Sequence, residues 1–192
     1  MAEKDEIQTA GVGRGRGLRR QLAVLVRRER RRGRHYQPRF QLSQLGVTWL
    51  GALAAVALLG LLSVWSGHAL IVAPLGASSV LLFAVPSSPL AQPRNLVLGH
   101  GLGALNGMVL HHLFGQSPLV LAAAVALTVL LGQLLRCLHP PAGGMAFFVV
   151  LLGAPWSFLL FPVLLGSLAL VLLAWGFSTW VPGALPYPRH WL

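Results

Sequence analysis

Acidic residues are nearly missing from this sequence. Only four Asp and Glu occur among its 192 residues, and all of them lie at or before Glu29. Membrane proteins that move cations usually hold them with a carboxylate inside the membrane, so sodium or proton coupling through a carboxylate is excluded for the rest of the chain. Charged residues of both signs make up 10% of the sequence, against about 25% in a soluble domain. The chain beyond residue 40 therefore lacks the charged surface of a soluble fold.

Cysteine is also scarce. The single Cys137 excludes an internal disulfide framework and a cysteine-based zinc site. A cleavable signal or transit peptide is not indicated either, because the chain begins MAEKDE and continues Arg-rich without an apolar core. We expect no metal ion and no cofactor.

Basic residues are concentrated at the N-terminus, where 12 of the 15 Lys and Arg lie at or before Arg39. The sequence GVGRGRGLRR is of low complexity, and QLAVLVRRERRRGR suits one or two turns of basic amphipathic helix. We expect residues 1–40 to form a basic, disordered cytoplasmic tail that binds anionic lipid through residues 14–39. An arm that binds nucleic acid is the less favoured interpretation, because an apolar region follows directly.

Six apolar segments follow within residues 41–192, which we treat as one membrane domain. Four are long enough to cross about 30 Å of hydrocarbon, and two are short and contain proline or glycine. The long segments are 44–65, 95–113, 119–138 and 155–181, and the short ones are 69–85 and 139–154.

The sequence partly matches itself when it is shifted by 67 residues. Pro74-Leu75-Gly76 then falls on Pro141-Ala142-Gly143, and Gly99 falls on Gly166. The two units are about 46–113 and 114–181, each with three segments. Because three is odd, tandem units would have opposite orientations in the membrane, as in many transporters. We therefore predict an all-α membrane bundle of two inverted three-helix repeats.

The few remaining cations favour six crossings. With the N-terminus in the cytoplasm, Arg94, Arg136 and Arg189 all fall on the cytoplasmic side, as the positive-inside rule prefers. If the two short segments are re-entrant instead, four crossings remain and Arg94 and Arg136 fall outside.

The two short segments are also the predicted binding site. A proline in the first turn followed by small residues leaves backbone N–H groups open to an anion at a helix N-terminus. Ser78 and Ser79 add hydroxyl donors, and His139 precedes the second break. The predicted substrate-binding residues are Pro74, Gly76, Ala77, Ser78, Ser79, His139, Pro140, Pro141, Ala142, Gly143 and Gly144.

A second group of residues is predicted to line the pathway or gate it. His100 lies within an apolar segment, where an ionisable group is costly. The whole group is Gln92, Arg94, Asn95, His100 and Arg136. The nearby Gly99, Gly101, Gly103 and Gly107 fit a helix-packing face equally well, and His68, His111 and His112 fit the ends of segments.

These motifs resemble the HPP family of integral membrane proteins. The resemblance rests on His139-Pro140-Pro141-Ala142-Gly143, on Pro74 to Ser79 and on Pro89 to Asn95, in that order, and covers about residues 43–181. It implies nitrite transport, which is linked to members in cyanobacteria and plastids, and a bacterial cytoplasmic or thylakoid-type membrane. It also implies four spans, against the six counted here. Gly144-Met145 and the Arg-rich tail depart from the family pattern.

We therefore expect a non-enzymatic transporter or channel for a small monovalent anion, with nitrite the first choice, that works as a homo-oligomer. The residues themselves do not separate nitrite from nitrate, formate, chloride or bicarbonate. The alternative is a structural or sensory membrane protein whose tail binds lipid, nucleic acid or a partner. An intramembrane hydrolase would need a nucleophile paired with a base, and no G-x-S-x-G motif supports one.

Overall fold

The computed structural model describes residues 19–33 and 40–191, and every regular element in these ranges is helical. The chain divides into two units, Met1–Gln41 and Leu42–Leu192, which are described separately. In the first unit, residues 19–33 form a helix, which is longer than the one or two turns expected. The predicted disorder of residues 1–18 and 34–39 lies outside the described residues.

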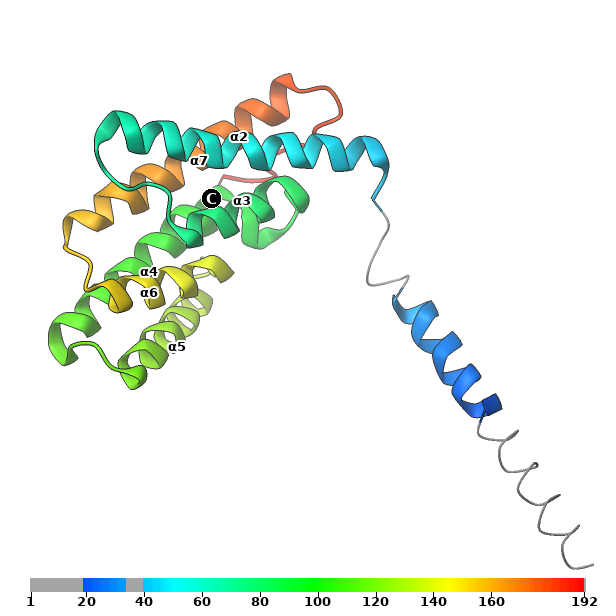
Figure 1. The fold of residues 1–192 in the computed structure, drawn as a ribbon, viewed down its shortest axis with the longest axis horizontal. Helices are drawn as coiled ribbons and strands as arrows, with labels where there is room; N and C mark the ends of the chain where they lie inside the picture. The colour runs from blue at the N-terminus through cyan, green and yellow to red at the C-terminus, as the bar shows by residue number, and fades with distance from the viewer. Residues whose placement is uncertain (1–18, 34–39, 192) are drawn as a thin grey trace, which may run out of the picture. The chain divides into compact units, whose positions relative to one another are not determined.

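The second unit contains the apolar segments, and its helices follow in the predicted order (Figure 1). The segment η2 runs directly into α7, and the chain is kinked within η2, where Phe161 has a non-helical φ of −126° and ψ of 113° and is followed by Pro162. The elements are α2 (Leu42–Ser66), α3 (Ala73–Ala84), η1 (Pro89–Ala91), α4 (Pro93–Phe114), α5 (Pro118–Leu134), α6 (Pro140–Leu152), η2 (Leu159–Leu164) and α7 (Leu165–Trp180). The all-helical prediction is therefore confirmed for the described residues.

Most of these helices have proline in their first turn, and some end at a glycine. α3, α4, α5 and α6 all carry proline at one of their first two positions, where the missing N–H would have no partner within the helix. Ser117 caps α5 by accepting a hydrogen bond from the N–H of Val120. Gly153 ends α6 with a φ of 57°, in the left-handed region that favours glycine.

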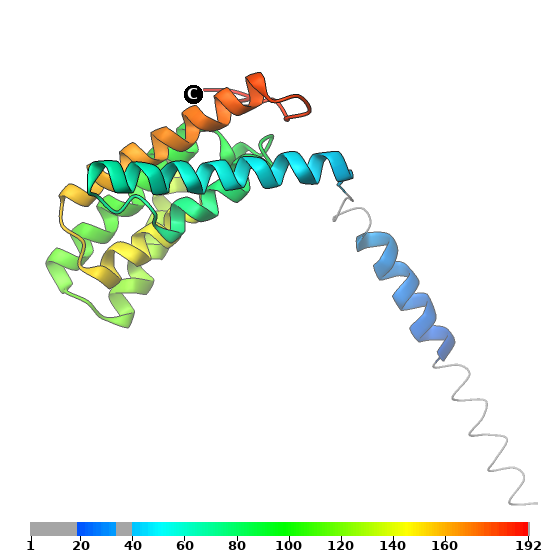
Figure 2. The ribbon, with the colours of Figure 1, turned by 45° about the horizontal axis from the view of Figure 1, so that its top comes forward.

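The helices pack in a pattern that is symmetric between the two halves of the unit. α2 contacts α3 as α5 contacts α6; α4 contacts α6 as α7 contacts α3; and α4 contacts α5 as α7 contacts α2. The contacts of α3 with α6 and of α4 with α7 each pair two counterparts. The contacts of η1 with α3 and α4 have no counterpart, and α4 packs against α6 much more extensively than α7 packs against α3. Figures 1 and 2 both show α5 and α6 beside α4, and α2 beside α7.

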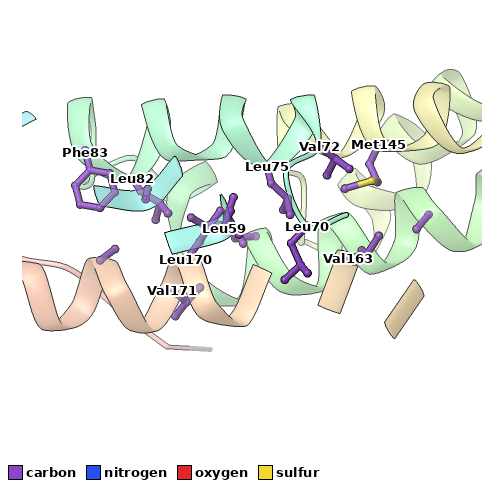
Figure 3. Packing of buried hydrophobic residues seen from close by; sticks show 14 of the residues in the cluster. Leu59, Leu70, Val72, Leu75, Leu82, Phe83, Met145, Val163, Leu170 and Val171 are labelled. Atoms are coloured by element: carbon purple, nitrogen blue, oxygen red, sulfur yellow. The ribbon is translucent and has the colours of Figure 1, made fainter. Parts of the chain in front are cut away.

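The main core lies between α2, α3, α4, α6 and α7. It is built mostly from aliphatic side chains that are almost fully buried, and Figure 3 shows Leu59 and Leu170 close together and Met145 of α6 beside Val72. This core fixes α3, whose first turns carry half of the predicted binding site.

Of the four segments expected to be long enough to cross a membrane, two in the described residues have both the length and the hydropathy, Leu42–Ser66 and Leu159–Trp180, whereas the helix Pro118–Leu134 is shorter than expected. Many large apolar side chains on the outside of the bundle are exposed, including Leu61 and Val64 of α2 and Leu172 of α7. An apolar exterior of this kind is suited to lipid rather than to water. The 12 residues of α3 span only about 18 Å, so this helix is shorter than the hydrocarbon layer.

Candidate functional site

The predicted site residues Ser78, His100 and His139 meet in one buried cluster. Ser78 lies on α3, His100 on α4, and His139 is the residue that precedes α6. The Ser78 Oγ is 2.7 Å from the His100 Nε2 and 2.8 Å from the His139 Nε2. All three residues are at most 2% exposed. Sequence reasoning placed His100 on the pathway rather than with Ser78, so the structure joins two groups that were predicted apart.

The serine hydroxyl has a third contact, with its own helix. Its Oγ is 3.1 Å from the carbonyl oxygen of Pro74, one turn earlier. A hydroxyl has one proton and two lone pairs, so three partners use all of its hydrogen-bonding capacity. Ser78 is therefore the centre of the cluster, and both histidines are positioned by it.

His139 is also held from its other ring nitrogen. Its Nδ1 is 2.7 Å from the carbonyl oxygen of Leu90 in η1, and this contact leaves the Nε2 as the nitrogen that meets Ser78. The His100 and His139 rings lie edge to face, with centroids 4.8 Å apart. The His100 Nδ1 is buried and has no hydrogen-bond partner among the described residues.

Glycines on α4 make this close approach possible. A Cβ on Gly99 would lie 2.7 Å from the Cβ of His139 and 3.0 Å from the carbonyl oxygen of Cys137. A Cβ on Gly103 would collide with the carbonyl oxygen of Ala142, and one on Gly107 would lie 2.8 Å from that of Ala146. The interpretation as a packing face is confirmed for Gly99, Gly103 and Gly107, which bring α4 against α6, whereas Gly101 faces Leu164 at an ordinary contact distance.

The backbone N–H groups expected to receive an anion are largely occupied. The N–H groups of Leu75 and Gly76 both donate to the carbonyl of Val72, and that of Ala142 donates to the carbonyl of His139. The prolines before them have no N–H to offer. The side-chain cluster, rather than two bare helix ends, is thus the polar centre of this region.

Of the other predicted binding residues, Pro74 joins the cluster through its carbonyl, and the rest have no side-chain contact in it. Ser79 donates its hydroxyl to the carbonyl of Gly76 at 2.6 Å, and Ala77 is exposed. The two proline breaks do lie close together, because a Cβ on Gly144 would be 3.9 Å from the Cγ of Pro74. Pro140, Pro141 and Gly143 complete the first turn of α6.

The polar residues at the start of α4 bind carbonyl groups of neighbouring segments. The Asn95 amide donates to the carbonyl of Leu138 at 2.8 Å, and the Arg94 guanidinium donates to that of Leu135 at 3.2 Å. These contacts fix the segment that delivers His139. Arg136 is exposed and has a φ of 53°.

Gln92 holds the loop before α4 to the C-terminal segment. Its side-chain N–H groups donate to the carbonyls of Pro86 and Ser88, and its Oε1 accepts from the backbone N–H of Arg189 at 2.8 Å. The Tyr187 hydroxyl donates to the carbonyl of Ala91 at 3.1 Å, and burial raises the pKa of Tyr187, which keeps this donor protonated. Sequence reasoning missed Tyr187, which belongs to no recognisable pattern, and the carbonyl of Leu90, because a backbone acceptor within the motif Pro89 to Asn95 leaves no signal in the residue types.

A small cavity adjoins His139. It measures about 20 Å³ and is lined by Gly99, Thr128, Cys137, Pro140 and Gly143, among others. About one water-sized group fits in such a volume. The space next to the cluster is therefore about the size of one water molecule.

The fold and the buried cluster together define a helical membrane protein with a serine-histidine centre. The chain matches the family model described as HPP, transmembrane region, over residues 37–187, and it belongs to this family. The resemblance drawn from the motifs is thus confirmed. Two transmembrane proteins of Dictyostelium discoideum are similar to it, one 32% identical over 78% of this chain and 56% of the relative, the other 33% identical over 71% and 48%. The chain spans about half the length of these curated relatives. No solved structure matches it.

Proposed function

We propose that the chain is a transmembrane transporter or channel for a small monovalent anion, with nitrite as the first candidate. The observation that carries the proposal is the buried contact of Ser78 with His100 and His139. Ionisable groups inside a membrane domain are costly to bury, and they usually mark a substrate or ion path.

The negative charge of the proposed substrate follows from the chemistry of the cluster. No Asp or Glu occurs after Glu29, whereas hydroxyl and imidazole groups can present protons to an acceptor. A small anion needs such donors, and a cation would need oxygen ligands with negative charge. The resemblance to nitrite-linked members of the family favours nitrite among the small anions.

The proposed architecture is two inverted repeats of three helices, α2–α4 and α5–α7. The symmetric contact pattern supports it, since exchanging α2 with α5, α3 with α6 and α4 with α7 leaves the pattern unchanged. We propose six segments across a bacterial cytoplasmic or thylakoid-type membrane, with the N-terminus in the cytoplasm. The two halves meet where α3 faces α6, close to the cluster, as in transporters built from inverted repeats.

The N-terminal unit has a separate proposed role at the membrane surface. In the helix over residues 19–33, Leu22, Leu25 and Val26 share a face and are exposed, and seven arginines surround them. Basic amphipathic helices of this kind bind anionic lipid, so we propose lipid rather than nucleic acid as the partner of residues 14–39. This helix also favours the second candidate function, a structural or sensory protein that acts through its tail.

An enzymatic role is a weaker candidate function, although the cluster shares one feature with the active sites of enzymes. A serine in contact with a histidine that is oriented by a third group is the usual arrangement of an activated nucleophile. Here the Ser78 hydroxyl has three partners and no exposed surface, so an ester cannot reach it. We propose that the protein is not a hydrolase, and that Ser78 does not react with a fluorophosphonate probe under native conditions.

The test is anion uptake by the purified full chain in proteoliposomes, with nitrite, nitrate, formate and chloride compared. Ser78→Ala and His139→Gln each remove one side chain of the cluster. His112→Gln is the matched control, because His112 is an exposed histidine on the same helix as His100. Saturable nitrite uptake that the two cluster variants lose and the control keeps supports the proposal. A folded protein without anion flux would contradict it, and loss of activity in cells only on deletion of residues 1–40 would favour the second candidate.

A further inference from the structure

The cluster has one more hydrogen-bond contact than its neutral side chains have protons. Four contacts connect it: Ser78 with the Pro74 carbonyl, Ser78 with each histidine Nε2, and the His139 Nδ1 with the Leu90 carbonyl. Every one of these contacts requires a proton between its two atoms. One serine and two neutral histidines supply three protons, so a fourth proton completes the set.

The contacts also determine where the fourth proton must go. The Leu90 carbonyl can only accept, so the His139 Nδ1 must be protonated. If His139 is neutral, its Nε2 accepts a hydrogen bond from the Ser78 hydroxyl, and the hydroxyl can then no longer donate to the Pro74 carbonyl. If His139 is protonated at Nε2 as well, the hydroxyl is free to donate to Pro74, and all four contacts are satisfied.

His100 does not need a second proton in either state. Its Nε2 donates to the Ser78 Oγ as a neutral ring, and its Nδ1 then carries a lone pair, which agrees with the lack of any partner at that atom among the described residues. The complete cluster therefore bears one positive charge, on His139, and this residue borders the small cavity.

Few other charged groups surround this histidine. On α4 they are His100 and Arg94, whose guanidinium is bound to the Leu135 carbonyl. The segment before α6 adds the Cys137 thiol, and the C-terminal segment adds the Tyr187 hydroxyl, which is bound to the Ala91 carbonyl. α3 contributes only serine hydroxyls, and no carboxylate exists after Glu29 to balance a buried cation.

We infer that His139 takes up a proton together with the anion, so that the proton is the co-substrate. The inference rests on the proposed function and adds its coupling ion. A buried imidazolium without a counter-ion is costly, and a buried anion without a counter-ion is equally so. When both are present the pair is neutral, so each stabilises the binding of the other.

The transported charges balance in this scheme. One proton from water binds the His139 Nε2, the Ser78 hydroxyl turns from that nitrogen to the Pro74 carbonyl, and one anion enters beside the ring. On the other side of the membrane the anion and the proton leave, and the hydroxyl turns back to the Nε2. One turnover moves one anion and one proton, with no net charge.

Electrical recording of nitrite transport tests this directly. Proteoliposomes that hold the full chain are adsorbed on a solid-supported membrane, and nitrite is added at constant pH. Proton-coupled transport predicts nitrite uptake, measured in parallel, with no transient current, and a rate that is insensitive to an imposed potential. Uncoupled anion movement predicts a current and about tenfold accumulation for each 59 mV of interior-positive potential. Protein-free vesicles correct for leakage of nitrous acid, which is also electroneutral.

A proton-uptake measurement tests the same inference without transport. Nitrite is added to the purified protein in weakly buffered detergent with a pH indicator dye present. We expect about one proton bound per nitrite bound, retained in His112→Gln and lost in His139→Gln, which cannot be protonated. His100→Gln separates the two histidines, because the inference predicts that it weakens binding but leaves the ratio of protons to bound nitrite unchanged.

The outcomes distinguish the inference from the proposed function. Nitrite uptake accompanied by current, with no proton bound, overturns the proton coupling and leaves the anion transporter in place. No uptake and no nitrite binding by a folded protein overturn both. Electroneutral uptake that His139→Gln retains in full overturns the role of His139.

Discussion

The two halves of the membrane unit share a frame but differ in chemistry. Val72 precedes α3 and His139 precedes α6, at positions 67 residues apart. At the same shift, Ser78 corresponds to Met145, and His100 corresponds to Ser167. Corresponding pairs of α-helices are in contact in the two halves, whereas the polar side chains do not correspond.

This difference shows how one site can arise at the junction of two similar units. Each half supplies a short helix, but only the first places a hydroxyl inside it and only the second places an imidazole before it. Met145, the counterpart of Ser78, lies fully buried in the apolar core. A symmetric polar frame would bury twice as many polar groups, and burying each of them is costly.

The largest difference in nitrite uptake and stability is expected between Ser78→Ala and Met145→Leu, which change corresponding positions of the two halves. Ser78→Ala leaves two buried ring nitrogens without a partner, at about 1–3 kcal/mol each, and we expect nitrite uptake to fall to the level of protein-free vesicles. Met145→Leu conserves volume and should cost less than about 1.5 kcal/mol. Thermal unfolding in detergent and uptake measure both. Comparable losses in the two variants would mean that Ser78 acts only in packing.

The second contrast is between Gly99→Ala and Gly166→Ala. A Cβ on Gly99 meets the Cβ of His139 and a backbone carbonyl, which cannot move independently of the fold, whereas a Cβ on Gly166 meets the flexible end of Leu75. We expect Gly99→Ala to lower stability by about 1–3 kcal/mol and to displace His139, and Gly166→Ala to cost clearly less. Uptake should fall in Gly99→Ala alone. Equal effects would indicate that α4 does not set the position of the ring.

The sequence predicted the frame of the protein better than its site. Segment length, hydropathy and proline spacing give the helices, because those features act locally along the chain. Ser78, His100 and His139 were each singled out, yet their meeting was not predicted, since it depends on how closely the glycine face of α4 approaches α6. The donors expected to be bare at Leu75 and Gly76 are occupied, because the carbonyl of Val72 is close enough to take both.

A third contrast concerns the loops that join the short helices to the next long ones. The loop before α4 is bound by the C-terminal segment through Tyr187, whose hydroxyl contacts Ala91. Tyr187→Phe should cost about 0.5–1.5 kcal/mol and shift the thermal midpoint slightly. Its matched control is Tyr36→Phe, because Tyr36 is the other tyrosine of the sequence.

The ionisation of Tyr187 gives this contrast a pH dependence. Burial raises the pKa of Tyr187 above its ordinary value, which is about 10 in an unfolded chain. The folded state therefore resists deprotonation, so its contribution is fully present below about pH 10 and is lost as the pH rises above this value. Unfolding free energy measured from pH 8 upward should decline less steeply in Tyr187→Phe. A parallel decline in both proteins would contradict the assignment.

The smallest expected effect is at Ser167, the counterpart of His100. The Ser167 Oγ is fully buried and has no hydrogen-bond partner among the described residues, so Ser167→Ala removes a polar group that is costly to bury. We expect unfolding free energy to stay constant or to rise by up to about 1 kcal/mol, with nitrite uptake unchanged. A clear loss of stability or uptake would mean that Ser167 has a partner supplied by water or by the transported anion. The second half would then have a polar site of its own, and the asymmetry between the halves would be smaller than the side chains indicate.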